Sequence, residues 1–173
     1  NATQLLGSVK EALSYGSNTF MFYTGAPQNT RRGMISDELT YEAYKLMKDN
    51  NIKLENIIGH APYIVNLCND EKFEFSVSFL RQEVERCSML GITKLVLHPG
   101  ASVGNTKEYA INNIIKGLNL ILDNFTNEEK SFYDFEVFIT NEIEKELYPM
   151  IAYKHRNNLA FTITKKVGVE NEK

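Results

Sequence analysis

The sequence predicts an α/β fold built around a parallel β-sheet. Three short apolar segments typical of strands, at residues 19–23, 56–60 and 94–98, alternate with segments whose apolar residues recur at helical spacing. The connections between them are short, so each helix is expected to lead to the next parallel strand through a right-handed crossover. Because the strand segments are almost wholly apolar, helices should cover both faces of the sheet.

The first part of the chain is expected to supply two helices and two strands. A helix should end before Gly16, since glycine suits a helix C-terminus. Residues 19–23 (TFMFY) are β-branched and aromatic, which favours a buried strand closed by the turn formers at 25–27. Ser36 is placed to cap a helix that runs to Asn50, and residues 56–60 form the next strand. The expected inward-facing residues of the two helices are Leu5, Leu6, Val9, Ala12 and Leu13, then Leu39, Ala43, Leu46 and Met47.

The alternation of helices and strands continues up to Phe125, and beyond it the sequence pattern becomes less distinct. A helix ending at Gly91 is followed by the strand at 94–98, and Asn105 or Thr106 starts another helix. Beyond Phe125 the pattern predicts a strand at 135–140, a helix at 142–152, a strand at 159–164 and a frayed charged tail. The expected buried residues of the two helices are Phe73, Val77, Leu80, Val84 and Cys87, then Ile111, Ile114, Ile115, Leu118, Ile121 and Leu122.

Composition limits the class of protein. With 173 residues, 43% hydrophobic and 24% charged, the chain has the size and balance of one soluble globular domain, and no apolar run approaches the roughly 20 residues of a membrane span. A net charge of −3 gives no global attraction for nucleic acid, so such binding needs a local patch or metal ions. Two cysteines do not form a disulfide framework, which favours a reducing, intracellular compartment. The start on Asn1, without methionine or signal sequence, leads us to expect a segment of a longer chain.

Two of the three histidines occupy matching positions. His60 and His98 each end a predicted strand, and a proline follows shortly after each. Ligands gather at the carboxyl ends of parallel strands, and neighbouring strands lie about 4.8 Å apart, so two such imidazoles can share one metal ion. A single histidine at a strand end is more often a hydrogen-bonded structural residue. The matched pair leaves the structural and the metal-binding interpretations about equal, and zinc would need further ligands.

Three ordered motifs carry a resemblance to a known family. The stretches SNTFMFYTGAPQNTRR (17–32), GHAPYIVNL (59–67) and LGITKLVLHPGASVG (90–104) resemble the endonuclease IV family of apurinic/apyrimidinic (AP) endonucleases, over about residues 3–125. The resemblance implies a TIM-type (β/α)8 barrel, of which this chain would form about half to two thirds. It also implies up to three zinc ions in the barrel mouth and cleavage of DNA on the 5′ side of abasic sites. Residues 1–125 would be the N-terminal part of the barrel, and 126–173 a divergent segment.

The resemblance assigns roles to individual residues. His60 and His98 match two zinc ligands that share one ion with a glutamate from the next strand, for which Glu142 is a poorly matched candidate. Tyr63 matches a tyrosine that enters the DNA at the lesion, and Asn66 an asparagine beside it. The residues of the DNA-penetrating loop would be Gln28, Asn29, Thr30, Arg31 and Arg32. From the residues alone, Tyr63 could equally be a core aromatic, Arg31 and Arg32 a solvated pair, and Asn66 a residue that bonds its own turn.

The same comparison shows what these 173 residues lack. The family's first-strand H-V-S signature and its later acidic and histidine motifs do not occur, and His155 matches no ligand and is expected at the surface. The chain should therefore supply at most one partly formed zinc site. The leading interpretation is the N-terminal part of a monomeric AP endonuclease of base-excision repair, acting on double-stranded DNA in a bacterial cytoplasm or a eukaryotic nucleus or organelle. The alternatives are a metal-dependent sugar isomerase or epimerase on a related barrel, and a non-catalytic module that binds DNA or a partner chain.

Overall fold

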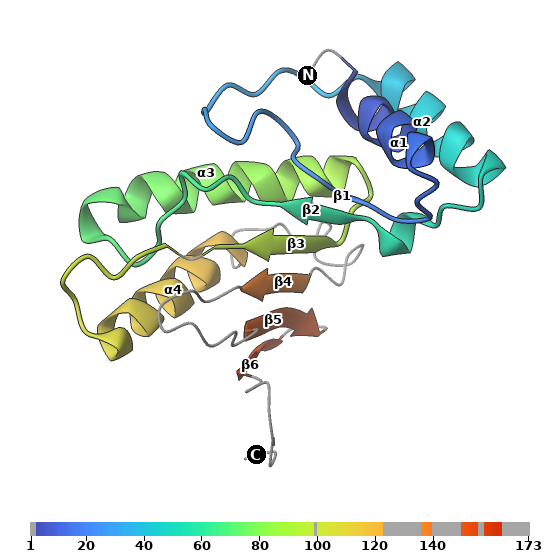
Figure 1. The fold of residues 1–173 in the computed structure, drawn as a ribbon. Coiled ribbons are helices and arrows are strands. Elements are labelled where there is room, and N and C mark those ends of the chain that lie inside the picture. The colour runs from blue at the N-terminus through green and yellow to red at the C-terminus, as the bar shows by residue number, and fades with distance from the viewer. Residues whose placement is uncertain (1–2, 99, 123–135, 140–149, 156–157, 164–173) are drawn as a thin grey trace.

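One β-sheet with helices packed along it organises the chain (Figure 1). The computed structural model describes residues 3–98, 100–122, 136–139, 150–155 and 158–163. The elements, in chain order, are α1 (Gln4–Ser14), β1 (Met21–Phe22), α2 (Asp37–Asp49), the 3-10 turn η1 (Leu54–Asn56), β2 (Ile58–His60), α3 (Asp70–Met89), β3 (Lys94–Leu97), α4 (Lys107–Leu122), β4 (Glu136–Ile139), β5 (Met150–His155) and β6 (Asn158–Ile163). Helix α1 packs against α2, and α3 packs against α4.

The sheet runs in the order β1-β2-β3-β4-β5-β6. The first four strands are parallel, which confirms the parallel α/β architecture. Strands β5 and β6 are antiparallel to their neighbours, which the alternation of helices and strands did not predict. The predicted helix at 142–152 is wrong for residues 150–152, which belong to β5, because pairing with β4 and β6 outweighs local helix propensity. Residues 142–149 lie outside the described part of the chain.

Local signals set the helix ends. The Ser36 hydroxyl accepts a hydrogen bond from the Leu39 backbone N–H at 3.3 Å, which starts α2 as the sequence predicts. Asn69 caps α3 in the same way through the N–H of Glu71. Beyond the C-terminus of α3, Gly91 has a φ of +60°, a conformation that a residue without Cβ adopts at little cost. These termini explain why each helix returns the chain to the sheet after a short connection.

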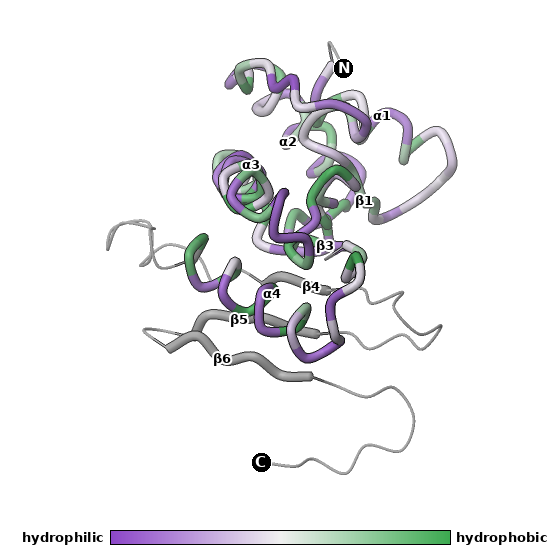
Figure 2. The backbone as a smooth tube through the Cα atoms, turned by 90° about the vertical axis from the view of Figure 1, so that its left-hand side faces the viewer, coloured by the Kyte–Doolittle hydropathy of each residue, from purple (hydrophilic) through white to green (hydrophobic). Residues whose placement is uncertain are grey.

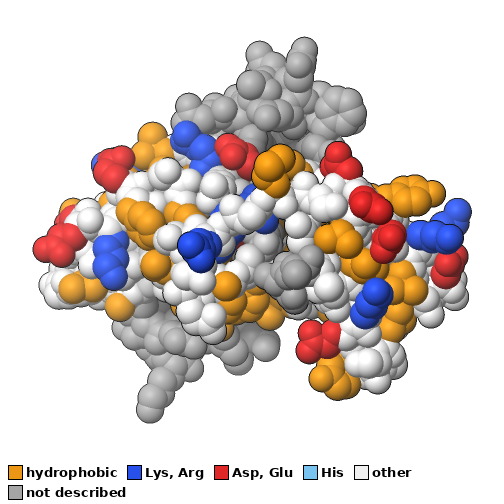
Figure 3. Space-filling model, turned by 90° about the horizontal axis from the view of Figure 1, so that it is seen from above, with side chains coloured by type: hydrophobic (Ala, Val, Ile, Leu, Met, Phe, Trp, Pro, Cys, Tyr) orange, Lys and Arg blue, Asp and Glu red, His pale blue; other side chains and the backbone are white. Residues whose placement is uncertain are grey.

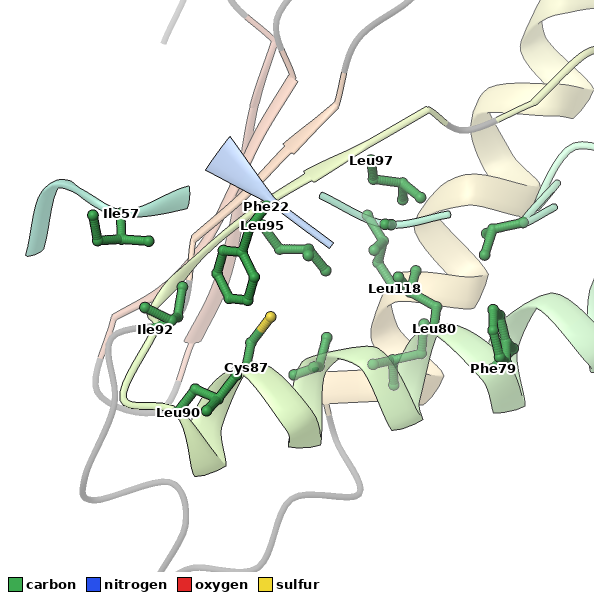
Figure 4. Packing of buried hydrophobic residues seen from close by; sticks show 14 of the residues in the cluster. Phe22, Ile57, Phe79, Leu80, Cys87, Leu90, Ile92, Leu95, Leu97 and Leu118 are labelled. Carbon is green, nitrogen blue, oxygen red and sulfur yellow. The ribbon is translucent and has the colours of Figure 1, made fainter. Parts of the chain in front are cut away.

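The core is formed by the strands and the apolar faces of the helices α1 to α4. In Figure 4, Cys87 of α3 points toward Phe22 and Leu95 of the strands, and Leu80 of α3 lies beside Leu118 of α4. Figure 2 shows β1 in hydrophobic colours, while α3 alternates between hydrophobic and hydrophilic positions, as expected for a helix with one buried face. In the described part of the chain, no helix combines the length and the hydropathy that crossing a membrane requires.

Strand β1 is only partly buried, although its composition predicts a fully buried strand. Its first residue, Met21, is 54% exposed, whereas Phe22 is buried. Strand β1 stands at the end of the described sheet order and pairs with β2 alone. A strand at a sheet edge lacks a second neighbour to cover it, so an apolar sequence there does not ensure burial.

Both cysteines are expected to resist modification. Cys68 and Cys87 are buried and form no disulfide, and burial raises the pKa of the Cys68 thiol to about 11 and that of Cys87 to about 12. The thiolate is the reactive form, so we expect a disulfide reagent at pH 8 to modify the native chain at least about 100-fold more slowly than the chain unfolded in guanidinium. Modification of the native chain should continue to accelerate as the pH rises above about 9, where the reaction of an ordinary thiol levels off. Rapid modification of one thiol in the native chain would contradict the burial.

Candidate functional site

The two strand-end histidines lie side by side. His60 is the last residue of β2, and His98 directly follows β3. Their ring centroids are 5.1 Å apart with an angle of 40° between the ring planes. With metal–nitrogen bonds of about 2.1 Å and tetrahedral angles, two imidazoles on one zinc ion have centroids roughly 5 Å apart. The spacing therefore suits a shared ion, and it follows from the parallel pairing of β2 with β3.

His60 is held in the form that binds metals. Its side chain is 3% exposed, and Nδ1 lies 2.7 Å from the Ala61 carbonyl oxygen. A carbonyl only accepts, so Nδ1 carries the proton and the lone pair of the neutral ring is on Nε2. Burial lowers the pKa of His60 and the nearby His98 lowers it further, whereas the Ala61 hydrogen bond opposes both effects. The neutral imidazole is favoured, and this is the form that ligates metal ions.

Two tyrosines complete an aromatic cluster around the imidazoles. Tyr63 stacks on His98 at a centroid distance of 4.9 Å, lies 5.3 Å from His60, and is 63% exposed. The exposed ring does not fit the alternative of a core aromatic. Tyr23, which directly follows β1, lies 5.0 Å from His60; burial and a hydrogen bond with Tyr63 raise the Tyr23 pKa to about 12. The sequence analysis missed Tyr23 as a site residue, although it follows a strand end, as His98 does.

The loop after β1 separates into exposed and buried residues. Gln28, Asn29 and Arg31 are exposed, and the Asn29 side-chain oxygen accepts a hydrogen bond from the Arg31 backbone N–H at 2.9 Å. Arg32, which the resemblance places among the DNA contacts, instead turns inward and forms an ion pair with the buried Glu83. Its side chain crosses Gly25, where an added Cβ would lie 2.8 Å from Arg32 Cδ. Because the guanidinium is paired inside the protein, Arg31 is the arginine of this loop that the structure presents to solvent.

The described residues alone do not complete a zinc site. The imidazoles of His60 and His98 are ligands of the right type, but zinc is held by three or four protein ligands. Across the described ranges, no cluster of three or more histidine, cysteine, aspartate or glutamate side chains is placed to hold a metal ion. Glu142 lies outside the described residues, beyond β4, whose last residue Ile139 pairs with Leu97 next to His98. His60 and His98 could thus supply two of the three or four ligands that zinc requires.

Comparison with known proteins identifies the family. A sequence model described as "Xylose isomerase-like TIM barrel" matches residues 9–136. The chain belongs to this family. It is 57% identical over 122 residues to "Probable endonuclease 4" of Enterococcus faecalis, covering 68% of this chain and 40% of that protein. It is 52% identical over 120 residues to "Probable endonuclease 4" of Acholeplasma laidlawii, covering 68% and 41%.

A solved structure supports the same assignment. The crystal structure of endonuclease IV from Thermus thermophilus superposes with a TM-score of 0.55 at 26% identity, covering 70% of this chain and 44% of that one. The resemblance to endonuclease IV and the partial TIM-barrel fold are thereby confirmed. The chain spans about two fifths of the length of the curated relatives it matches. The four parallel strands are accordingly part of a barrel of this family.

Asn66 links the loops that follow the two histidine-bearing strands. Its Nδ2 donates to the Ala101 carbonyl at 3.2 Å, its Oδ1 accepts from the Cys68 N–H at 3.0 Å, and its own N–H donates to the Ser76 hydroxyl at 2.9 Å. The bond to Cys68 lies within the turn of Asn66, as one of the two interpretations of this residue predicted. The bond to Ala101 also joins Asn66 to the neighbouring loop. Asn66 thus holds the segment after His98 against the segment that carries Tyr63.

The contact of Asn66 with the second loop depends on Gly100. Gly100 has a φ of +100°, and a Cβ there would lie 2.1 Å from Asn66 Oδ1. We expect Gly100→Ala to destabilise the chain by about 2 kcal/mol or more, measured by chemical denaturation, since backbone strain and a clash act together. Gly104→Ala is the matched control, because Gly104 also has positive φ (+84°) but has open space where its Cβ would stand. Equal losses in the two variants would show that the clash with Asn66 contributes nothing.

Proposed function

We propose that this chain is part of an AP endonuclease of DNA base-excision repair, and that it supplies the histidine pair and the aromatic side chain that meets the lesion. One observation carries the proposal: the exposed Tyr63 ring stacks on His98 beside His60 at the carboxyl edge of the parallel strands. The names of the endonuclease 4 relatives support the reaction class, hydrolysis of a phosphodiester bond. The substrate would be double-stranded DNA that carries an abasic site, cut on its 5′ side.

The arrangement suits a distorted duplex. An abasic site leaves a gap in the base stack, and a flat exposed ring such as Tyr63 can fill that gap while the sugar is turned out of the helix. Gln28, Asn29 and Arg31 lie on the exposed loop beside Tyr23 and can contact phosphates. Figure 3 shows acidic and basic side chains interspersed on the face that is seen from above the view of Figure 1. Because the chain also has a net charge of −3, contacts from particular residues, rather than a broad positive field, would carry the binding.

The same proposal includes zinc. Bound zinc ions would generate hydroxide at neutral pH and neutralise charge on the phosphodiester. Within this chain, His60 and His98 would hold one ion, with Glu142 as the candidate third ligand. The neutral form of His60 and the fixed position of its Nδ1–H prepare the ring for that role. Any further ligands would come from parts of the full-length protein that this chain does not span.

Binding and cleavage assays test the proposal. A fluorescent duplex with one tetrahydrofuran abasic analogue should bind the chain at least about tenfold more tightly than the undamaged duplex of the same sequence, because only the gap accepts the Tyr63 ring. In the full-length protein, zinc should permit cleavage that leaves an extendable 3′-hydroxyl, and a chelator should abolish it. Equal affinity for both duplexes, or cleavage that persists without metal, contradicts the proposal.

The incomplete ligand set supports a second candidate. A non-catalytic module that binds DNA or a partner chain would need no complete metal centre, and within the described residues none is formed. Zinc content separates the two functions: about one equivalent or more per chain supports the endonuclease, and far less than one supports the module. The description of the family mentions xylose isomerase, but the relatives are named endonucleases, which favours the endonuclease over the isomerase alternative.

A further inference from the structure

A buried charged cluster lies between the loop after β1 and helix α3. We call Thr24, Arg32, Glu83 and Arg86 the anchor cluster. The Arg32 and Glu83 side chains are 2% and 0% exposed, and they form an ion pair. Isolated buried charges are costly, so a buried pair persists where further hydrogen bonds satisfy it. The cluster supplies such bonds to both Glu83 oxygens and to Nε and Nη1 of Arg32, and nearly all of them involve the backbone or side chains of residues 24–33. Arg32 Nη2 is the exception, since it is buried without a hydrogen-bond partner among the described residues.

Thr24 joins the loop to two residues of α3. Its hydroxyl donates to Glu83 Oε2 at 2.6 Å and accepts from Arg86 Nε at 3.1 Å. Its carbonyl accepts from Arg86 Nη2 at 2.9 Å. The third nitrogen of the Arg86 guanidinium, Nη1, donates to the Gly33 carbonyl at 2.7 Å. The first and last residues of the loop 24–33 are therefore both bound to one turn of α3.

Arg32 organises the middle of the same loop. Its Nη1 lies within hydrogen-bond distance of the carbonyls of Ala26 (3.3 Å), Asn29 (3.0 Å) and Arg31 (2.8 Å). Its guanidinium also lies 4.8 Å from the centre of the Phe79 ring of α3. The loop thus folds around a cation that Glu83 holds in place. An apolar pair of similar size could fill the same volume but could not bond these carbonyls.

The anchor cluster is connected to the site through the chain itself. Tyr23 precedes Thr24 and packs its ring against His60 and Tyr63. We propose that Glu83 is a positioning residue, which acts through Thr24 and the two arginines to fix the loop 24–33 and Tyr23 in the conformation that presents Arg31 and Tyr63 to DNA. The DNA part of this inference rests on the proposed function. Glu83 lies in α3, and its carboxylate bonds to Thr24 and Arg32, so its effect on metal binding by the strand-end histidines should be small.

Proteolysis tests the anchoring without DNA. Trypsin cleaves after arginine, Arg31 is exposed, and its carbonyl is bonded to Arg32 in the anchored loop. We expect Thr24→Val, which removes both hydroxyl contacts and keeps the ion pair, to increase cleavage between residues 31 and 33 at least about fivefold. Thr19→Val is the matched control, since the Thr19 hydroxyl donates to the Asn56 carbonyl at the opposite end of β1. An unchanged rate in Thr24→Val, or the same increase in Thr19→Val, overturns the anchoring.

Paired binding assays test the consequence for function. Thr24→Val should weaken binding of the abasic duplex about fivefold or more, while its zinc affinity stays within about twofold of wild type. Glu83→Gln should have a larger effect of the same kind; if that variant fails to fold, Thr24→Val still decides. A parallel loss of zinc affinity would show general damage rather than positioning and overturn the inference. If the wild-type chain does not prefer the abasic duplex, the proposed function fails, and the proteolysis result alone decides whether the bonds of Thr24 to Glu83 and Arg86 anchor the loop.

Discussion

His98→Ala is expected to lower the zinc affinity of this chain by about 100-fold or more, measured by competition with a metal indicator. Loss of a partner that only orients a metal ligand already costs about 10- to 100-fold, and loss of a ligand itself costs at least as much. The described residues bring only two imidazoles together, so the remaining histidine could not hold zinc as a chelate. His60→Ala should also lower the zinc affinity strongly, because either substitution leaves a single imidazole at this site.

The third histidine supplies the control for this experiment. His155 lies in β5, which is separated from β3 by β4 in the sheet order. His155→Ala should leave zinc affinity within about twofold of wild type, since its strand lies two strand spacings, about 9.6 Å, from β3, and residues that far apart usually act independently. Zinc affinity that is insensitive to His98→Ala would remove the metal role from the pair and leave the strand-end histidines as structural residues. Circular dichroism of each variant separates loss of a ligand from loss of the fold.

The parallel part of the fold was predictable because its signals are local. Ser36 and Gly91 define helix ends through their own backbone and side chains, and the apolar spacing of each helix matches the face that it buries. Strand β5 was not predictable in the same way. Its residues 150–152 are compatible with a helix, and the ladder with β4 and β6 decides their conformation. Pairing between distant segments is the information that a local pattern does not contain.

The part of the candidate site that follows the ends of the strands was predictable from the sequence. His60, His98 and Tyr63 follow two neighbouring strands, and parallel pairing alone brings them together. The burial of the Arg32 side chain was not predictable, because its partner Glu83 lies 51 positions away in the sequence. One signal was nevertheless present: Ser76, Leu80, Glu83 and Cys87 step by four, three and four residues along α3, and all are buried. A carboxylate at a buried helix position requires a partner, and the arginines of the loop were the candidates.

Arg32→Met is expected to destabilise the chain by about 3 kcal/mol, which is the lower end of the range for breaking a buried ion pair by removing one partner. The methionine side chain fills similar space, so the loss comes from leaving the Glu83 carboxylate buried without its ion-pair partner. Arg86 remains nearby: burial lowers the pKa of Arg86, but its attraction to Glu83 opposes that effect, so its charge continues to stabilise the carboxylate. This remaining interaction is why the lower end of the range is expected.

The double variant separates the charge from the packing. Arg32→Met combined with Glu83→Leu removes both charges, and replacement of a buried pair by apolar residues is often neutral or stabilising. Chemical denaturation should therefore find the double variant more stable than Arg32→Met alone, by about 2 kcal/mol or more. Trypsin should nevertheless cleave after Arg31, the tryptic site that this variant keeps, faster than it does in wild type, because the bonds from Arg32 to the loop carbonyls are lost. Stability would then recover while loop order would not, which is the behaviour expected if the buried pair specifies the conformation of the loop rather than the stability of the fold.

A double variant no more stable than Arg32→Met would mean that the loss came from packing and not from an unpaired charge.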